Sequence, residues 1–361
     1  PLWTGDAWQD NCKIRPSSLM GSLRFWFEVI CYFSGICKIE KESDKVVNFK
    51  EGRFEKEVDR EKLEKCLLEK GNYFQAKIEC LNEQKIPLPS IIFGTTNWKS
   101  LIEIESIKYL KNYCFGNYFN LPYAIAFSKR NKSDKPKEFN TKEELNTFID
   151  MRYKNRSREE NYKKFREEYS VFYLSTPYFY GDFTVIFNVE EEIIEPIFFP
   201  LLTFMEKYGF WGGKWNIGYG RLKVESVKID NTIENNWKRD KFDLSIFKKN
   251  KNIRLDDLIQ EVNTFNDLIG NQTLIKIRFL KYLTGKTTFK EGIEELLKEK
   301  SIKRGEFRDS NEKRHKIFGK TGNPRQMSYV PQGSKILPYI FEENGQFSGG
   351  FLSIVGLLNL D

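Results

Sequence analysis

The sequence has one histidine, His315, and six cysteines, all of which lie in the first third of the chain. No two cysteines form a C-x-x-C pair, and the histidine lies far along the chain from Cys12, Cys31, Cys37, Cys66, Cys80 and Cys114. Structural zinc sites and disulfide frameworks need closely spaced ligands or cysteine partners. We therefore expect no metal and no disulfide framework, and we interpret the cysteines as reduced thiols.

Long apolar segments are also missing. No apolar run reaches the roughly 18 residues that a membrane-spanning helix needs. The first residues lack the basic-then-apolar layout of a secretory signal. The sequence therefore indicates a cytoplasmic protein with no membrane partner.

The common nucleotide-binding loops are absent as well. In the glycine-rich segment 210–221, Trp215 follows the Gly-Gly-Lys where a Walker loop requires serine or threonine, and Lys223 stands where a dinucleotide loop requires glycine. Both motifs connect a strand to a helix, whereas this segment follows a predicted helix and leads into a predicted strand near Leu222. We therefore predict no ATP, no NAD and no other cofactor.

Catalytic groupings are equally sparse. His315 stands in a basic segment without an assignable acid or nucleophile, so a histidine-dependent triad is hard to build. Asp6 and Asp10 flank the opening loop and leave one enzymatic alternative, which is metal-assisted or general-base cleavage of RNA. Aspartates in loops usually serve as polar turn residues, so we expect no enzymatic activity.

Positive charge is present and unevenly distributed. The chain carries 59 basic and 51 acidic side chains, a net charge of +8, and ten basic against four acidic residues between Lys298 and Arg325 give six of these charges. Such a concentration of cations is typical of a phosphate-binding surface, although a solvated loop without a ligand is the simpler alternative. The residues expected to bind RNA here are Lys313, Arg314, His315, Lys316, Lys320 and Arg325.

A second basic group stands at the start of a predicted helix, in "KIRPSSLMGSLRFW". Apolar residues at helical spacing over 19–33 predict a largely buried helix with a serine cap and an end near Gly35. The free N–H groups of a helix start attract anions, so the basic neighbours predict a docked phosphate unless they are incidental. The residues expected to hold it are Lys13, Arg15, Ser17, Ser18 and Arg24. Arg24 can instead pair with Glu28 one turn later.

The glycine-rich segment carries cations and aromatic residues between its glycines. Glycine lets another backbone approach closely, cations bind phosphates, and aromatic faces stack on bases with about 1–3 kcal/mol per base. The alternative is a simple connection whose tryptophans belong to the core. The residues expected to contact RNA are Lys214, Trp215, Tyr219 and Arg221.

Patterns elsewhere predict further elements. Alternation over 101–110 and 181–189 predicts strands, and 191–209 predicts a helix that Pro200 kinks or divides. Residues 129–169 are dominated by charge and predict an inserted helical arm.

The last third of the chain combines two kinds of pattern. Residues 255–269 and 289–300 predict helices. Asn344-Gly345 predicts a tight hairpin turn between two strands.

Together these segments resemble the RAMP superfamily, the repeat-associated proteins of CRISPR systems. "RPSSLMGSLRFW" resembles the helix start of that family, "GGKWNIGYGRLKV" resembles its glycine-rich loop, and "IFG" resembles its recurrent short motif. The opening "PLWTGDA" and the aromatic "LRFWFE" are most similar to the large RAMP subunit at the head of the type III-B Cmr effector complex.

The resemblance implies an α+β fold with two ferredoxin-like (RRM-like) βαββαβ modules and charged helical insertions at about 38–72 and 129–169. We expect an N-terminal domain over residues 1–230 and a C-terminal helical and hairpin domain, a candidate second module, over residues 231–361. The family pattern also leads us to expect a first strand before Pro1.

The implied function is non-catalytic RNA binding in antiviral defence. The expected partners are the 3′ region of CRISPR RNA, single-stranded target RNA and the other RAMP subunits of the Cmr complex. Two alternatives stay open: a RAMP-type endoribonuclease that uses Asp6 or Asp10, and a structural subunit whose basic patches face protein neighbours only.

Overall fold

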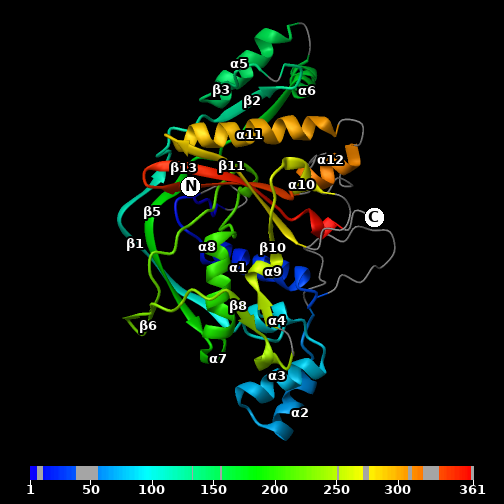
Figure 1. Cartoon of the computed structure of the whole chain (residues 1–361), viewed down its shortest axis with the longest axis vertical. Coiled ribbons are helices and arrows are strands. Elements are labelled where there is room, and N and C mark those ends of the chain that lie inside the picture. The colour runs from blue at the N-terminus through cyan, green and yellow to red at the C-terminus, as the bar shows by residue number, and fades with distance from the viewer. Residues whose placement is uncertain are drawn as a thin grey trace.

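The structure, a computed structural model, describes residues 1–5, 11–37, 56–131, 133–154, 157–249, 252–270, 276–307, 311–319 and 333–358. The molecule is elongated, with a central body and one projection at each end (Figure 1). Helices and strands both contribute to the body, so the predicted α+β class is confirmed. No helix within the described ranges combines the length and the apolar character needed to cross a bilayer.

The first helix, α1 (Pro16–Phe33), runs through the body with most of its apolar side chains buried. It ends where the sequence predicts, and Gly35 follows with a positive φ of 72°. The prediction of a serine cap is wrong, because Arg15 is the N-cap residue and no side chain caps the helix. Pro16 occupies the first helical position, where its fixed φ and its missing N–H already suit a helix start.

Two long antiparallel strands, β1 (Ile102–Gly116) and β5 (Tyr178–Val189), form one side of the body. They confirm the predicted strands at 101–110 and 181–189 and extend beyond both of them. Leu2 makes a β-bridge with Phe179 of β5. The carbonyl of Pro1 accepts a hydrogen bond from the N–H of Gly220 at 2.8 Å. The first residues therefore lie between β5 and the end of the glycine-rich segment.

A charged arm is inserted between β1 and β5, as the sequence predicts, and forms the upper projection in Figure 1. It has its own sheet, in the order β3-β2-β4, and its own small core around Phe139 and Phe165. Both of its helices begin with a side-chain cap, from Thr141 and Ser157. The elements are β2 (Ala124–Ser128), β3 (Lys137–Phe139), α5 (Lys142–Arg152), α6 (Arg158–Glu168) and β4 (Tyr169–Tyr173).

The predicted helix at 191–209 is present but divided. A short α7 (Glu191–Ile193) leads through a π-helical turn (Ile194–Phe198) into α8 (Phe199–Lys207). Pro200 lies in the first turn of α8, where a missing N–H is tolerated. The predicted division at this proline is therefore confirmed.

The strand predicted to begin near Leu222 is wrong. Residues 221–227 form no ladder with any described strand. The strand that follows them, β6 (Lys228–Ile229), pairs with β7 (Thr232–Ile233). Alternation indicates which face each side chain takes, but a strand also requires a neighbour with available backbone groups.

The last third of the chain forms a sheet in the order β10-β11-β13-β12, and α11 (Phe289–Glu306) lies between this sheet and the arm (Figure 1). The helix confirms the prediction at 289–300. Asn344 and Gly345, with φ of 52° and 74°, form the predicted turn of the β12–β13 hairpin. The strands are β10 (Ile259–Glu261), β11 (Ile277–Lys286), β12 (Ile336–Glu343) and β13 (Gln346–Ser353).

The single helix predicted at 255–269 is wrong, because its middle part becomes a strand. β10 pairs in parallel with β11 and separates α9 (Leu255–Leu258) from α10 (Phe265–Ile269). The remaining elements are α4 (Leu88–Phe93), β8 (Lys241–Asp243), β9 (Asn252–Arg254), α12 (Asn311–Phe318) and single 3₁₀ turns at Trp215–Ile217, Ser245–Phe247 and Val355–Leu358.

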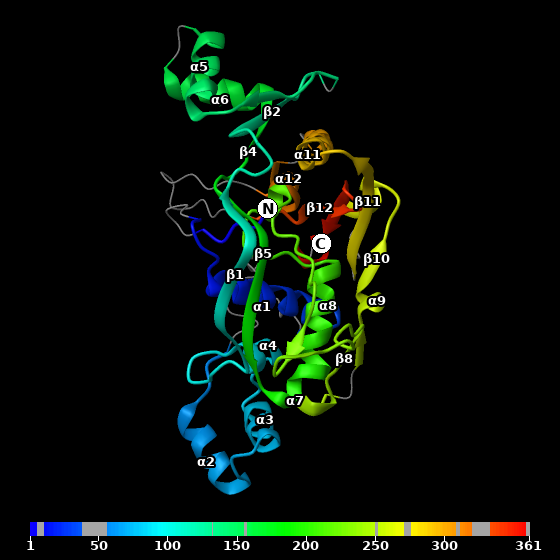
Figure 2. The same cartoon turned by 90° about the vertical axis from the view of Figure 1, so that its left-hand side faces the viewer.

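The largest core contains residues from both sides of position 230. Figure 2 shows α1 and α8 between the β1–β5 pair and the strands β10 and β11. Phe27 of α1 lies 6.1 Å from Phe242, and Tyr208 lies 5.6 Å from Phe279, between ring centroids. The two halves therefore share one apolar interior, and the domain boundary at 230 stays a prediction.

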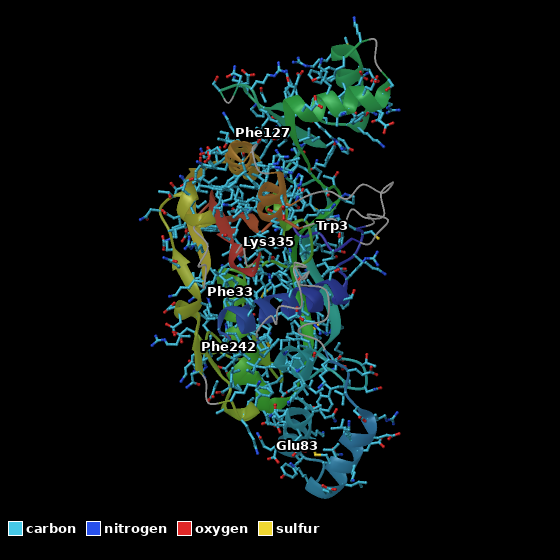
Figure 3. All side chains as sticks on the ribbon, turned by 90° about the vertical axis from the view of Figure 1, so that its right-hand side faces the viewer. Trp3, Phe33, Glu83, Phe127, Phe242 and Lys335 are labelled. Atoms are coloured by element: carbon cyan, nitrogen blue, oxygen red, sulfur yellow. A yellow bond between two sulfur atoms is a disulfide. The ribbon has the colours of Figure 1, made fainter. Side chains whose placement is uncertain are left out.

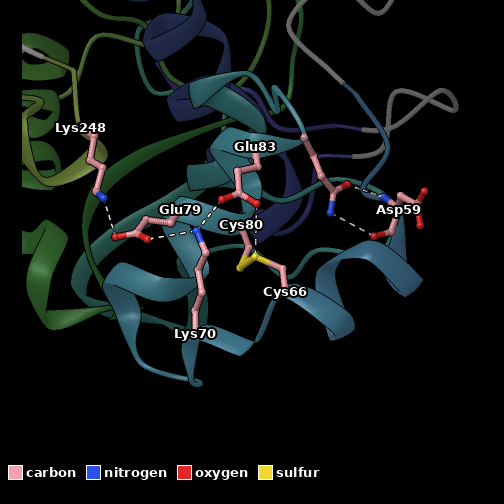
Figure 4. The surroundings of a disulfide bond; sticks show 8 residues. Asp59, Cys66, Lys70, Glu79, Cys80, Glu83 and Lys248 are labelled. Atoms are coloured by element: carbon pink, nitrogen blue, oxygen red, sulfur yellow. Dashed lines mark hydrogen bonds and ion pairs between the residues drawn. A yellow bond between two sulfur atoms is a disulfide. The ribbon is translucent and has the colours of Figure 1, made fainter. Parts of the chain in front are cut away.

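The lower projection is a lobe of two helices, α2 (Arg60–Lys70) and α3 (Phe74–Glu83), which Figure 4 shows in detail. Cys66 and Cys80 form a disulfide between them, so the expectation of reduced thiols is wrong for this pair. The packing of the helices brings the two Cα atoms to 5.9 Å, which is within bonding range. Lys248 of the body also contacts Glu79 of the lobe at 2.5 Å.

The shared core can be tested with Phe242→Ala, at the buried position labelled in Figure 3. We expect the free energy of unfolding to fall by about 3–5 kcal/mol in one cooperative urea transition, because the lost ring leaves a cavity. Leu68→Ala, at a side chain that is 88% exposed, is the control and should change it by less than about 0.5 kcal/mol. Two separate transitions, with only one shifted, would contradict a shared core.

Candidate nucleic-acid interface

The glycine-rich segment forms a tight loop that depends on backbone conformations open mainly to glycine. Gly212 and Gly220 have φ of 68° and 95°. An added Cβ would lie 2.3 Å from the carbonyl oxygen of Trp3 at Gly212, and 2.2 Å from that of Trp211 at Gly220. Close approach of another backbone, which the sequence predicts for these glycines, is therefore confirmed.

Backbone hydrogen bonds join this loop to the first residues and to α1. The N–H of Gly212 donates to Ser22 Oγ at 2.9 Å, and the N–H of Gly213 donates to the carbonyl of Trp3 at 2.7 Å. Lys214 Nζ lies 4.7 Å from the centroid of the Trp3 ring. The cation–π contact places this lysine beside the N-terminal segment.

The start of α1 is joined to the same segment through Thr4. The N–H of Arg15 donates to Thr4 Oγ1 at 3.1 Å, and Ser18 Oγ donates to the Thr4 carbonyl at 3.3 Å. Thr4 directly follows Trp3, which contacts the glycine-rich loop. The structure therefore brings together the two groups of residues that the sequence identifies separately.

The charged side chains described at this junction are Lys13, Arg15 and Lys214, which are all basic. The first turn of α1 contains no acidic residue that would oppose the partial positive charge of the helix start. Lys13 and Ser17 are exposed on either side of Arg15. Lys214 is half-buried, and burial lowers the pKa of its ammonium group.

Aromatic residues of the loop are packed into the body. Trp215 lies 5.7 Å from Trp26 and 5.2 Å from Phe25, between ring centroids, and keeps part of its surface exposed. Tyr219 is 0% exposed, and its hydroxyl donates to the Ser175 carbonyl at 3.1 Å. Burial raises the pKa of the Tyr219 hydroxyl well above its usual range. The prediction that Tyr219 lies at an RNA-facing surface is wrong, because its ring is buried in the core.

Arg221 has a structural position. Its guanidinium donates to the carbonyls of Glu206 and Lys207 at 2.7 and 2.9 Å, and also to that of Gly209. Glu206 and Lys207 provide the last carbonyls of α8, which a helix leaves without intrahelical partners. Burial lowers the pKa of the guanidinium to about 10. Nη1 and Nη2 therefore hold the end of α8, whereas Nε has no hydrogen-bond partner among the described residues, and the expected contact with phosphate stays a prediction.

Arg24 adopts the alternative that the sequence leaves open. Its Nε donates to Glu28 at 2.9 Å, and its Nη1 donates to the carbonyl of Gly94 at 3.1 Å. The side chain therefore connects α1 to the segment that follows α4.

The basic group on α12 lies partly within the described residues. Lys313, Arg314, His315 and Lys316 all belong to this helix. Lys316 pairs with Glu312 at 2.7 Å, and Lys313 Nζ lies 5.9 Å from the ring of Phe307. The candidates that lie outside the described residues are Lys320, Arg325, Asp6 and Asp10. No group of three or more metal-ligating side chains is arranged around a metal position in the described part of the chain.

The structure adds a residue that the sequence reasoning missed. Lys300 of α11 is 3% exposed, and its Nζ donates to the carbonyl of Asn216 in the glycine-rich loop at 3.1 Å. Burial, and secondarily the charge of Arg304 one turn later, lower the pKa of Lys300 to about 7. The available signal was its spacing, because Lys300 continues the apolar helix face of Ile293 and Leu297.

Fold and site together define an α+β protein in which a glycine-rich loop is held between α1 and α11. The family model of the RAMP superfamily matches residues 1–223, and the chain belongs to this superfamily. Membership suggests a CRISPR-associated role in RNA binding. No curated protein and no solved structure matches the chain.

The buried lysine predicts a pH dependence of stability. Its pKa in the folded protein, about 7, lies below the ordinary value of 10.5. Between these values the unfolded chain binds more protons, so the free energy of unfolding should rise as the pH increases from about 7 to about 10.

Urea unfolding at several pH values, with wild type and Lys300→Met side by side, measures the effect. In Lys300→Met the free energy of unfolding should rise less than in wild type between about pH 7 and about pH 10. Equal pH dependence in the two proteins would contradict the assignment.

Proposed function

We propose that the protein is a non-catalytic, cytoplasmic RNA-binding subunit of a type III-B CRISPR (Cmr) effector complex in antiviral defence. One observation carries the proposal: lysine side chains from both halves of the chain meet at the glycine-rich loop. Lys214 lies in the loop beside the first residues, and Lys300 reaches its Asn216 carbonyl from α11.

This arrangement suits recognition of an RNA backbone. Phosphates are bound by lysine and arginine, by backbone N–H groups and by helix starts, without reading the base sequence. The surface proposed to face RNA combines exposed Lys13 and Ser17, the half-buried Lys214 and the cations of α12. Binding to many guide sequences requires this kind of sequence-independent contact.

The proposal includes two ferredoxin-like modules. In the second half, β11, α11, β12 and β13 follow one another in β-α-β-β order, and β13 lies between β11 and β12 in the sheet. This is the arrangement of the first part of such a module. The fourth strand differs, because β10 precedes the others and pairs in parallel with β11.

The first half supports a comparable arrangement. α1, β1, β5 and α8 occur in the corresponding order. The bridge from Leu2 to Phe179 and the hydrogen bond from Gly220 to Pro1 place both ends of this half beside β5. The proposed partners, by family resemblance, are the 3′ region of CRISPR RNA, target RNA and other RAMP subunits.

The proposal predicts salt-dependent binding of single-stranded RNA. The logarithm of the association constant should fall with the logarithm of salt concentration, with a slope of about −0.7 for each phosphate neutralised. A fluorescence anisotropy titration of labelled RNA at increasing potassium chloride measures the slope. No detectable binding at low salt would favour the alternative of a structural subunit that binds only protein neighbours.

Charge reversal tests the position of the surface. Lys13→Glu should weaken RNA binding by about tenfold, because it replaces an attractive phosphate contact with repulsion. Lys65→Glu makes the same change at an exposed position on α2, in the opposite lobe, and should change the affinity less than about twofold. Equal effects of both variants would place RNA elsewhere or indicate only a net-charge effect.

Absence of catalysis is tested with the same RNA. Labelled RNA incubated with the purified protein and Mg²⁺ should be recovered intact. Cleavage that disappears in Asp6→Ala or Asp10→Ala, with RNA affinity kept, would contradict the proposal and establish the endoribonuclease alternative.

A further inference from the structure

An aromatic cluster lies on the β1–β5 pair, next to the start of α1 (Figure 2). The Tyr109 hydroxyl accepts a hydrogen bond at 2.9 Å from the N–H of Ile14, two residues before α1 begins. This bond joins the cluster to the segment that carries the exposed Lys13. The members of this Tyr113 cluster are Tyr109, Tyr113 and Phe115 of β1 and Phe179 of β5.

One side of the Tyr113 ring is open. The ring stacks 5.0 Å from Tyr109 and 6.1 Å from Phe179, between centroids, and 46% of the residue is exposed. Rings on opposite sides of Tyr113 would lie about 7 Å or more apart, because contacting carbon atoms are about 3.5 Å apart. Tyr109 and Phe179 are only 5.9 Å apart, so both lie on the same side. The exposed surface therefore includes the other face of the ring.

A bulge in β1 fixes the position of this ring. The register shifts just before Tyr113, so that residues 110–112 of β1 lie opposite Asp182 of β5 alone. Gly181 has a φ of 124°, and an added Cβ there would lie 2.1 Å from the carbonyl oxygen of Asn112. Glycine at this position therefore permits the bulge, and a bulge redirects the side chains of its strand. All three residues of the bulge are exposed.

The charges around the ring favour a nucleic acid as its ligand. Lys111 of the bulge is exposed two residues before Tyr113, and the exposed Lys13 lies in the segment that binds Tyr109. The first turn of α1 adds no acidic residue, and its free N–H groups attract anions. Surfaces that bind single-stranded nucleic acid combine such cations with an open aromatic face on which a base stacks.

We propose that Tyr113 is a base-stacking residue. An unpaired base of single-stranded RNA stacks on the open face of its ring, and Lys13 and Lys111 supply positive charge for the adjoining phosphates. RNA as the ligand rests on the proposed function, whereas the position of the stacked base rests on the Tyr113 cluster. Because every base has an aromatic face, this contact accepts many sequences.

Two substitutions separate the ring from its apolar bulk. Tyr113→Leu keeps an apolar side chain against Tyr109 and removes the aromatic face. It should bind single-stranded RNA about tenfold more weakly, because a stacked base is lost. The salt slope should stay unchanged, because no phosphate contact is removed. Tyr113→Phe keeps the ring and should bind within about twofold of wild type.

The matched control is Tyr73→Leu, at a tyrosine that is 60% exposed and directly precedes α3 in the lobe. Its RNA affinity should equal that of wild type. All proteins are titrated by fluorescence anisotropy with a labelled single-stranded RNA and with an abasic strand of the same length. Wild type and Tyr113→Leu should bind the abasic strand equally, because it offers no base to stack.

A measurement on wild type does not depend on the folding of any variant. RNA that contains 5-iodouridine is irradiated with the protein, and the attached residue is identified by mass spectrometry. A base stacked on the ring should be attached at Tyr113.

The outcomes separate this site from the proposed function. RNA binding by wild type, with unchanged affinity in Tyr113→Leu and no attachment at Tyr113, overturns the stacking site and leaves the function intact. Equal losses by Tyr113→Leu with natural and abasic strands also overturn the site, because the ring then acts through the fold. Absence of RNA binding by wild type overturns the proposed function, and the stacking site fails with it.

Discussion

The rest of the structure depends on the backbone hydrogen bonds of the glycine-rich loop. Gly212 and Gly213 donate to Ser22 of α1 and to the Trp3 carbonyl, which fixes the loop against the first half of the chain. The same loop presents the Asn216 carbonyl to Lys300 of the second half. A side chain at Gly212 would collide with the Trp3 carbonyl. The loop therefore contacts both halves of the chain through these hydrogen bonds.

Burial of cationic side chains in this arrangement lowers the folding free energy that the protein gains. Arg24 and Arg221 show how the fold normally satisfies a partly buried cation, with a carboxylate partner or with helix-end carbonyls. Lys300 and Arg304 are arranged differently, because the neighbouring charges that act on them are positive. A structure that tolerates this arrangement gives up folding free energy, because burial of a charge without a carboxylate partner is costly.

Local patterns predicted the features that depend on neighbouring residues. The hairpin at Asn344-Gly345, the divided helix at Pro200 and the inserted arm all follow from turn preference, a missing N–H or charge density.

Features that depend on distant packing were not predictable. The segment after Leu222 lacks a ladder partner, Tyr219 enters the core, and Cys66 meets Cys80 because two helices pack together. Among the site residues, Lys214 and Lys13 were identifiable as cations beside glycine or a helix start. Lys300 could be singled out only by its spacing on the apolar face of α11, because the carbonyl that it binds lies in a loop distant in the sequence.

The central claim is that RNA lies along the glycine-rich loop, where the two halves of the chain meet. Photo-crosslinking of 4-thiouridine RNA to the purified protein, followed by mass spectrometry of the attached peptides, tests it most directly. The account predicts crosslinks in peptides from residues 11–18, from the loop at 210–220, and from α11 and α12. Crosslinks confined to α5 and α6 of the arm or to the α2–α3 lobe would contradict it, since these helices lie at the two ends of the molecule (Figure 1).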